Sequence, residues 1–153
     1  MKMLFENYDE RNTMQFINFR IASQSLPFEE ILQWLPNMPT PHCTRNNETA
    51  VIRGEEVKFT EDCMLFAQEV PEDELLNDEI KSFVEKLSVA KKELSELSKT
   101  ASITLWLSLY PDPTQLNFCI KNDTLKMIAD LGIDLDGSIL CLQEFYSGAY
   151  MDK

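Results

Sequence analysis

Residues 77–110, NDEIKSFVEKLSVAKKELSELSKTASITLWLSLY, are the most informative part of the sequence about the fold, because a helix pattern passes directly into a strand pattern within them. The spacing in the first part of this stretch predicts one long helix over residues 78–98, about 31 Å in length, with Asn77 as the N-cap. Apolar residues recur there every three or four positions, which is typical of one buried helical face. They are Ile80, Phe83, Val84, Leu87, Ala90, Leu94 and Leu97.

The second part of the stretch predicts a strand over residues 102–110. Four aliphatic residues alternate there with residues that are partly aromatic, so we expect both faces of the strand to be covered. The turn sequence Pro-Asp-Pro-Thr follows at residues 111–114, and Leu116, Phe118 and Ile120 alternate after it. The pattern predicts a hairpin between these two segments.

Three strands and a helix are predicted before the long helix. Ile17, Phe19 and Ile21 alternate with polar residues, which predicts a strand over residues 15–22. A helix is expected from Pro27, with an inward stripe, and three prolines end it. Its stripe consists of Phe28, Ile31, Leu32 and Leu35. Two further strands are predicted over residues 51–59 and 63–70, separated by a turn.

A helix and a strand are predicted after the expected hairpin. The helix is capped by Asn122 or Asp123, turns Leu125, Ile128 and Leu131 inward and stops at Gly132, and the strand covers residues 138–143. The order β-α-β-β-α-β-β-α-β predicts an α+β two-layer sandwich, with helices on one face of a largely antiparallel sheet. We expect one domain over residues 14–146, with loose tails at residues 1–13 and 147–153.

Acidic residues dominate the charge of the chain. It has 26 Asp and Glu against 14 Lys and Arg, a net charge of −12, with the excess centred on residues 51–100. Such a surface repels nucleic-acid phosphates and anionic lipid, whereas it attracts cationic partners. No apolar run has the length of a membrane span, and acidic residues stand where a secretory signal has its apolar core. We therefore expect a soluble cytoplasmic protein that binds neither nucleic acid nor membrane.

Residue patterns typical of catalysis or cofactor binding are missing from the sequence. His42 is the only histidine and stands beside Cys43, whereas catalytic Cys and His residues are usually distant in sequence. The four glycines form no phosphate-binding motif. We expect no catalytic residue, no cofactor and four reduced cysteines.

One group of residues resembles fragments of a calcium loop, namely Asp130, Asp134, Asp136 and Gly137. The complete motif also needs an oxygen ligand at position 132 and a glutamate at position 143, where this chain has glycine and glutamine. We interpret the group as a helix exit and a turn into a strand, and we expect no metal.

Two segments carry a resemblance to a known family. One is FINFRIAS, residues 16–23, followed by the proline-started helix and LQWLP, residues 32–36; the other is NFCIKNDTLKMIADLGIDLD, residues 117–136. The succession resembles the bacterial domain-of-unknown-function family numbered forty-two seventy-nine. The resemblance implies no catalytic residues, and some members of the family look like immunity or accessory proteins of bacterial toxin and mobile-element systems.

These observations favour a non-enzymatic acidic binding protein, a bacterial immunity protein that neutralises a cognate toxin with a basic surface. Complementary charge speeds the association of two proteins. The expected contact residues are therefore acidic ones. They are Glu55, Glu56, Glu61, Asp62, Glu69, Glu72, Asp73, Glu74, Asp78 and Glu79.

Three other functions remain open from the sequence. One is a small-molecule or peptide sensor with a pocket between helices and sheet, lined by large aromatic residues such as Trp34 or Trp106. Another is an accessory protein of a mobile element. The third is an enzyme of unrecognised type that uses Cys43 or His42.

Overall fold

The structure is a computed structural model that describes residues 14–71, 74–110 and 118–139. Five strands form the main sheet, namely β1 (Met14–Ser23), β2 (His42–Thr44), β5 (Asp62–Val70), β6 (Ser102–Tyr110) and β7 (Asp134–Ile139). Their order across the sheet is β2-β5-β1-β6-β7. Neighbouring strands are antiparallel, except that β6 and β7 are parallel.

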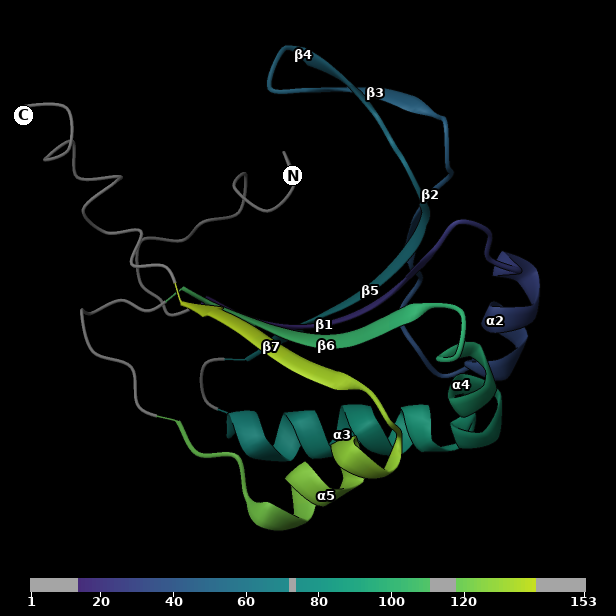
Figure 1. The fold of residues 1–153 in the computed structure, drawn as a ribbon. Helices are drawn as coiled ribbons and strands as arrows, with labels where there is room; N and C mark the ends of the chain where they lie inside the picture. Colours follow the sequence, from purple (N-terminus) through teal and green to yellow (C-terminus); the bar gives the residue numbers. More distant parts are fainter. Residues whose placement is uncertain (1–13, 72–73, 111–117, 140–153) are drawn as a thin grey trace, which may run out of the picture.

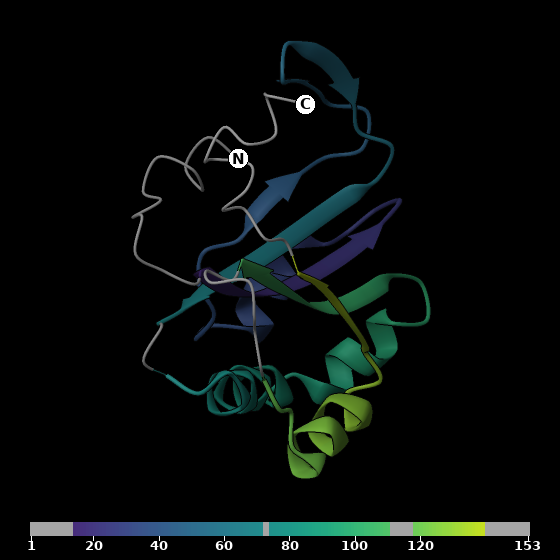
Figure 2. The ribbon, with the colours of Figure 1, turned by 90° about the vertical axis from the view of Figure 1, so that its left-hand side faces the viewer.

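All helices of the described residues lie on one side of this sheet (Figure 1), and a view at right angles shows the same layering (Figure 2). This arrangement confirms the predicted α+β class with helices on one face of a largely antiparallel sheet. The helices are α2 (Phe28–Trp34), α3 (Leu76–Ser88), α4 (Lys91–Leu97) and α5 (Asn122–Asp130).

The core lies between the sheet and the helices. Alternate residues of β1, β5 and β6 point into it, as the period-two patterns predict. Phe19 of β1 and Phe66 of β5 are fully buried opposite each other, with ring centroids 5.9 Å apart. Phe83 of α3 is fully buried in the same cluster. The aliphatic face of residues 102–110 therefore faces the helices.

The single helix predicted over residues 78–98 is wrong, because the chain forms two helices instead. At the break, the Ala90 amide donates to the Leu87 carbonyl at 3.0 Å, a bond across three residues rather than four. The Ser88 hydroxyl also donates to the Val84 carbonyl at 2.8 Å, a contact that often bends helices. The bend keeps the side chain of Leu94 fully buried in the core.

Helix ends differ from the predicted caps. α3 begins at Leu76, and Asn77 is buried with its side-chain oxygen accepting the Lys121 amide at 2.8 Å. The side chain of Asn77 therefore joins the start of α3 to the start of α5 instead of capping its own helix. Gly132 ends α5 at φ +68°, as predicted. Two residues of the predicted inward stripes, Leu32 and Leu125, are exposed.

The predicted hairpin between residues 102–110 and 116–120 is also wrong. Residues 118–120 are not a strand, and residues 111–117 lie outside the described part of the chain. β6 instead pairs with β1 on one side and β7 on the other, so no place beside it is left for a returning strand. The chain reaches β7 through α5, and such a helical crossover is the usual connection between parallel strands.

The last strand occupies residues 134–139, and residues 140–143 of the predicted strand lie outside the described part. Asp134, Asp136 and Gly137 therefore belong to β7 and not to a turn. The interpretation as a helix exit is correct for Asp130, because α5 ends there and Leu131 and Gly132 form the turn that follows. The strand begins four residues earlier than predicted, because the parallel pairing with β6 already starts at Asp134.

Residues 51–59 do not form one strand. The chain folds there into a separate hairpin of β3 (Thr49–Ile52) and β4 (Glu55–Lys58). Arg53 and Gly54 at its turn have φ values of +53° and +81°, and positive φ at both central residues is the pattern of a type I′ turn. The hairpin rises on the side of the sheet opposite to the helices (Figure 1).

None of the helices in the described residues is long and apolar enough to cross a membrane. The tails expected at residues 1–13 and 147–153 lie outside the described part of the chain, as do residues 140–146 of the expected domain.

Candidate functional site

The face of the sheet that carries no helix is the candidate site. The strands bend so that this face is concave (Figure 1). All helices of the described residues lie on the other side of the sheet, so none of these helices packs against this face. Its side chains are the alternate residues of each strand that do not enter the core. We call this surface the open face.

Side chains on the open face line up in rows across the strands. The middle row contains Ala67, Asn18, Trp106 and Asp136, which come in this order from β5, β1, β6 and β7. The next row contains Leu65, Arg20, Thr104 and Asp134 from the same strands. Neighbouring strands lie about 4.8 Å apart, so members of one row are direct neighbours.

Trp106 is the largest exposed side chain of the middle row, with 40% of its surface accessible. Its indole N–H donates to the Ser138 hydroxyl at 3.2 Å, which fixes the ring toward β7. On the other side, the Asn18 side-chain amide donates to the Trp106 carbonyl at 3.3 Å and to the Ser108 hydroxyl at 3.1 Å. These contacts hold the tryptophan and its strand in position while much of the ring remains in water.

A second aromatic group lies toward one end of the open face. Phe16 and Tyr110 contact each other edge to face, with ring centroids 6.3 Å apart and an angle of 77° between the rings. Both side chains are half-buried. The open face therefore carries three aromatic rings that run from Trp106 in its middle row toward one end, and we call these three rings its aromatic centre.

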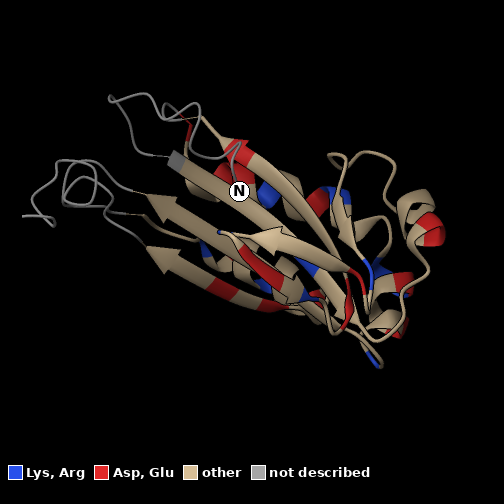
Figure 3. Cartoon of the chain, turned by 90° about the horizontal axis from the view of Figure 1, so that it is seen from above, with Lys and Arg blue, Asp and Glu red and all other residues tan. Residues whose placement is uncertain are grey.

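Carboxylates border the aromatic centre. Glu69 on β5 and Asp134 and Asp136 on β7 are exposed, and within the described residues none of the three has an ion pair. The basic residue Arg20 is paired with Glu61. Figure 3, the view onto this side, shows acidic residues on the edge strand β7 and on the hairpin. The rim is therefore negatively charged.

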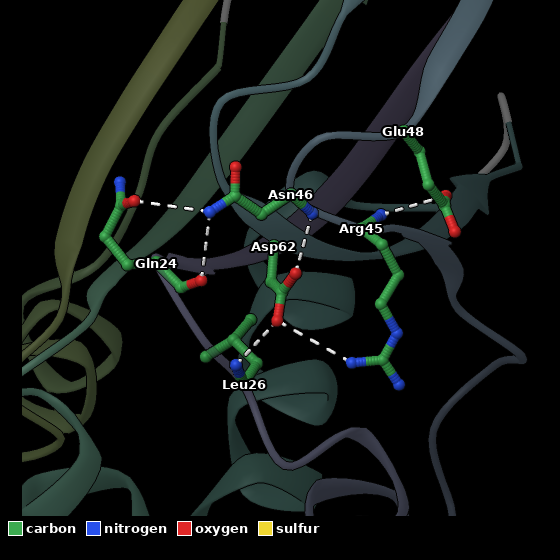
Figure 4. Close-up of polar contacts among 6 residues, drawn as sticks. All are labelled: Gln24, Leu26, Arg45, Asn46, Glu48 and Asp62. Carbon is green, nitrogen blue, oxygen red and sulfur yellow. Dashed lines mark hydrogen bonds and ion pairs between the residues drawn. The ribbon is translucent and has the colours of Figure 1, made fainter.

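Asp62 does not belong to this exposed rim. It is 5% exposed, and its two oxygens accept the amides of Leu26 and Asn46, each at 2.8 Å (Figure 4). The Arg45 guanidinium lies 3.7 Å from the same carboxylate. The hydrogen bond from the Asn46 amide is the main cause that lowers the pKa of Asp62 below its ordinary value of 3.8. Asp62 thus joins the start of α2 to the loop before the hairpin.

The structure separates the acidic residues that the sequence singled out. Glu55 and Glu56 are exposed on β4, whereas Glu61 and Glu69 lie near opposite ends of β5, about 26 Å apart along an extended strand. A third group surrounds the start of α3, where Glu74 and Asp78 are exposed and Glu79 accepts the Gln68 side-chain amide at 3.2 Å. Glu72 and Asp73 lie outside the described residues.

A pocket of about 560 Å³ opens beside the start of α3. Its polar lining includes Asn77 and Lys121, and its apolar lining includes the exposed side chains of Leu75 and Phe118. Neither Trp34 nor Trp106 lines it. Trp34 packs against the core, and Trp106 is on the open face, so the two tryptophans do not form the pocket expected between helices and sheet.

His42 and Cys43 are neighbours on β2 and therefore point to opposite sides of the sheet. This geometry prevents a direct hydrogen bond between them of the kind that activates a nucleophile. Burial raises the pKa of Cys63, which disfavours the reactive thiolate of that residue. Within the described residues, no three His, Cys, Asp or Glu side chains gather as a possible metal site.

Sequence reasoning missed Trp106 and Asp136 as one unit. The sequence pattern offers Trp106 as a pocket residue only in the sensor alternative, and it puts Asp136 in a turn. The proximity of the two residues depends on the parallel pairing of β6 with β7, which no local pattern shows. One signal was available in the sequence: one face of β6 is aliphatic, and the other face is a mixture of aromatic and polar residues, namely Thr104, Trp106, Ser108 and Tyr110. A strand face of this mixed composition is as compatible with exposure to solvent as with burial.

A comparison with protein-family models matches residues 12–142 to a family described as a domain of unknown function, DUF4279. No match was found among curated proteins or among solved structures. The matched range contains all strands and helices of the described residues, and it contains both segments on which the family resemblance was based. The chain therefore belongs to the DUF4279 family.

Proposed function

We propose that this chain is a non-enzymatic binding protein that docks a protein partner on its open face, and that it acts as a bacterial immunity protein against a toxin with a basic surface. One observation carries the proposal. The open face combines a fixed aromatic centre with a rim of carboxylates that have no ion pair within the described residues.

Aromatic side chains at the centre of a charged rim are typical of protein interfaces. Tryptophan and tyrosine are enriched among the residues that contribute most to binding, and polar residues around them exclude water and set the partner's orientation. Trp106 already has its indole N–H bonded to Ser138. Its ring therefore loses little freedom when a partner covers it, which favours affinity.

The charge of the chain indicates the kind of partner. A net charge of −12 repels nucleic acid and anionic lipid and accelerates encounters with a cationic protein. A toxin that acts on nucleic acid, such as a nuclease, presents a basic surface of this kind. The exposed acids of the hairpin, Glu55 and Glu56, extend the acidic surface on the same side of the sheet. We place the protein in the cytoplasm, where such a toxin would act.

Capture from the host organism tests the proposal. A tagged chain used as bait at moderate salt is expected to retain one basic protein, whose toxicity in cells is suppressed when the chain is co-expressed. Because the attraction is electrostatic, the association rate should fall steeply as salt increases. Failure to retain a protein partner would refute the proposal, as would a retained protein whose activity is unchanged by the chain.

The pocket beside α3 favours a second candidate, a sensor for a small molecule or peptide. Its volume of about 560 Å³ is within the range of ligand sites. A thermal-shift screen with metabolite pools separates the two functions, because a ligand that binds the native state raises its melting temperature. A shift that is lost when Lys121 is changed to alanine would support the sensor; no shift with any pool would contradict it.

A further inference from the structure

We propose that the partner inserts an arginine side chain over Trp106, where the guanidinium stacks on the indole ring and pairs with the carboxylates of Asp136 and Asp134. The inference rests on the proposed function, because it names the chemical group that the open face recognises. The partner in this proposal is a protein with a basic surface, which a net charge of −12 attracts.

The position of the two aspartates beside Trp106 follows from strand register. Trp106 and Asp136 are paired on the parallel strands β6 and β7, and Thr104 is paired with Asp134. Both carboxylates therefore project from the same face as the indole, one directly beside it and one diagonal to it. A cation above the ring can reach both of them.

The two aspartates are available for a cation from outside the chain. Both are exposed, and neither has an ion pair within the described residues. The nearest basic residue on this part of the face, Arg20, belongs to β1 and pairs with Glu61, on the side away from β7. Among the residues that the structure describes, the strands thus place an aromatic ring and two negative charges together without a positive charge between them.

Arginine fits this arrangement better than lysine. The guanidinium is planar, stacks on aromatic faces and donates two parallel hydrogen bonds to a carboxylate. Lysine offers a point charge that is more strongly hydrated, so it gains less from the ring. The hydrogen bond from the indole N–H to Ser138 keeps the ring fixed toward β7, which is the position that a stacked guanidinium requires.

A fluorescence titration tests the inference without knowledge of the partner. The chain contains two tryptophans, so Trp34→Phe leaves Trp106 as the only indole reporter. A short oligoarginine peptide is expected to change the emission of Trp106 in this background. It should bind about threefold more tightly than oligolysine of equal length, because of stacking. Equal affinities of the two peptides, or unchanged emission, would overturn the inference.

Two double variants, each with two carboxylates neutralised, test whether Asp134 and Asp136 bind the peptide. Asp134→Asn with Asp136→Asn is expected to weaken oligoarginine binding about fivefold, since two exposed ion pairs are lost. Glu85→Gln with Asp130→Asn is the matched control, because it changes net charge equally but lies on the helix layer. An equal loss in both variants would show attraction to net charge alone and would contradict the site.

The failure of this inference is distinguishable from failure of the proposed function. A captured partner that binds the Trp106→Ala variant as tightly as the unchanged chain would overturn the arginine site, while the binding function would stand. Absence of any partner in the capture experiment would overturn the function, while the fluorescence titration would still report on the site. An arginine site requires both the titration result and weaker binding of the partner to Trp106→Ala.

Discussion

Replacing Phe66 with alanine is expected to lower the free energy of unfolding by about 3 to 5 kcal/mol. Phe66 is fully buried on the inner face of β5, and its ring lies 5.9 Å from that of Phe19. The substitution leaves a cavity under the centre of the sheet and removes the contact between the two rings. Since small domains are stable by about 5 to 15 kcal/mol, much of the total would be lost.

Urea unfolding followed by circular dichroism measures this loss. Phe118→Ala provides the control, because Phe118 is 45% exposed and its removal should cost less than about 1 kcal/mol. If the two variants lost the same stability, the core would not lie between β5 and the helices as described.

The change Asp62→Asn is expected to cost about 2 to 4 kcal/mol at neutral pH. The two carboxylate oxygens accept the amides of Leu26 and Asn46, and asparagine can offer an oxygen to only one of them. The NH₂ group of the new side chain would point at the second backbone amide, and two hydrogen-bond donors cannot bond to each other. Because Asp62 is buried, water cannot easily replace the lost bond.

The stabilisation that Asp62 provides also depends on pH, and the direction of this dependence follows from its lowered pKa. The pKa of Asp62 is lowered in the folded chain, so its contribution to stability is present above the ordinary value of 3.8 and is lost as pH falls through the folded pKa. The stability difference between the unchanged chain and Asp62→Asn should therefore shrink below about pH 4. Asp134→Asn, at an exposed position, is the control and should change stability at neutral pH little. A stability difference for Asp62→Asn that does not vary with pH would argue against the charged hydrogen bonds.

Local sequence patterns predicted those helices and strands whose formation depends on residues close together in the sequence. The alternation around Phe19 identified β1, and the apolar spacing around Phe83 identified α3, since each pattern reports one buried face. The spacing could not reveal the break near Ala90, because the apolar stripe continues through it. What changes there is the backbone hydrogen bonding: the Ala90 amide donates to the Leu87 carbonyl and the Ser88 hydroxyl to the Val84 carbonyl, without a proline or glycine at the break.

Pairing between distant segments was harder to predict. The segment after residue 110 begins with turn residues, so a hairpin satisfied every local rule, yet the neighbour of β6 is the parallel strand β7. The candidate site depended on this pairing, because Asp136 becomes a neighbour of Trp106 only through it. The burial of Asp62 was likewise invisible, since its partners Leu26 and Asn46 come from other segments of the chain.

The affinity of two charge-reversal variants for the captured partner tests the binding account most directly. Glu69→Lys with Asp136→Lys changes the open face, and Glu85→Lys with Asp130→Lys changes the helix layer. Each reversal adds two units, so both variants carry −8 instead of −12. We predict that the open-face variant binds the partner about tenfold more weakly, while the helix-layer variant stays near the unchanged affinity. Equal loss in both variants, or a greater loss from the helix layer, would contradict docking on the open face.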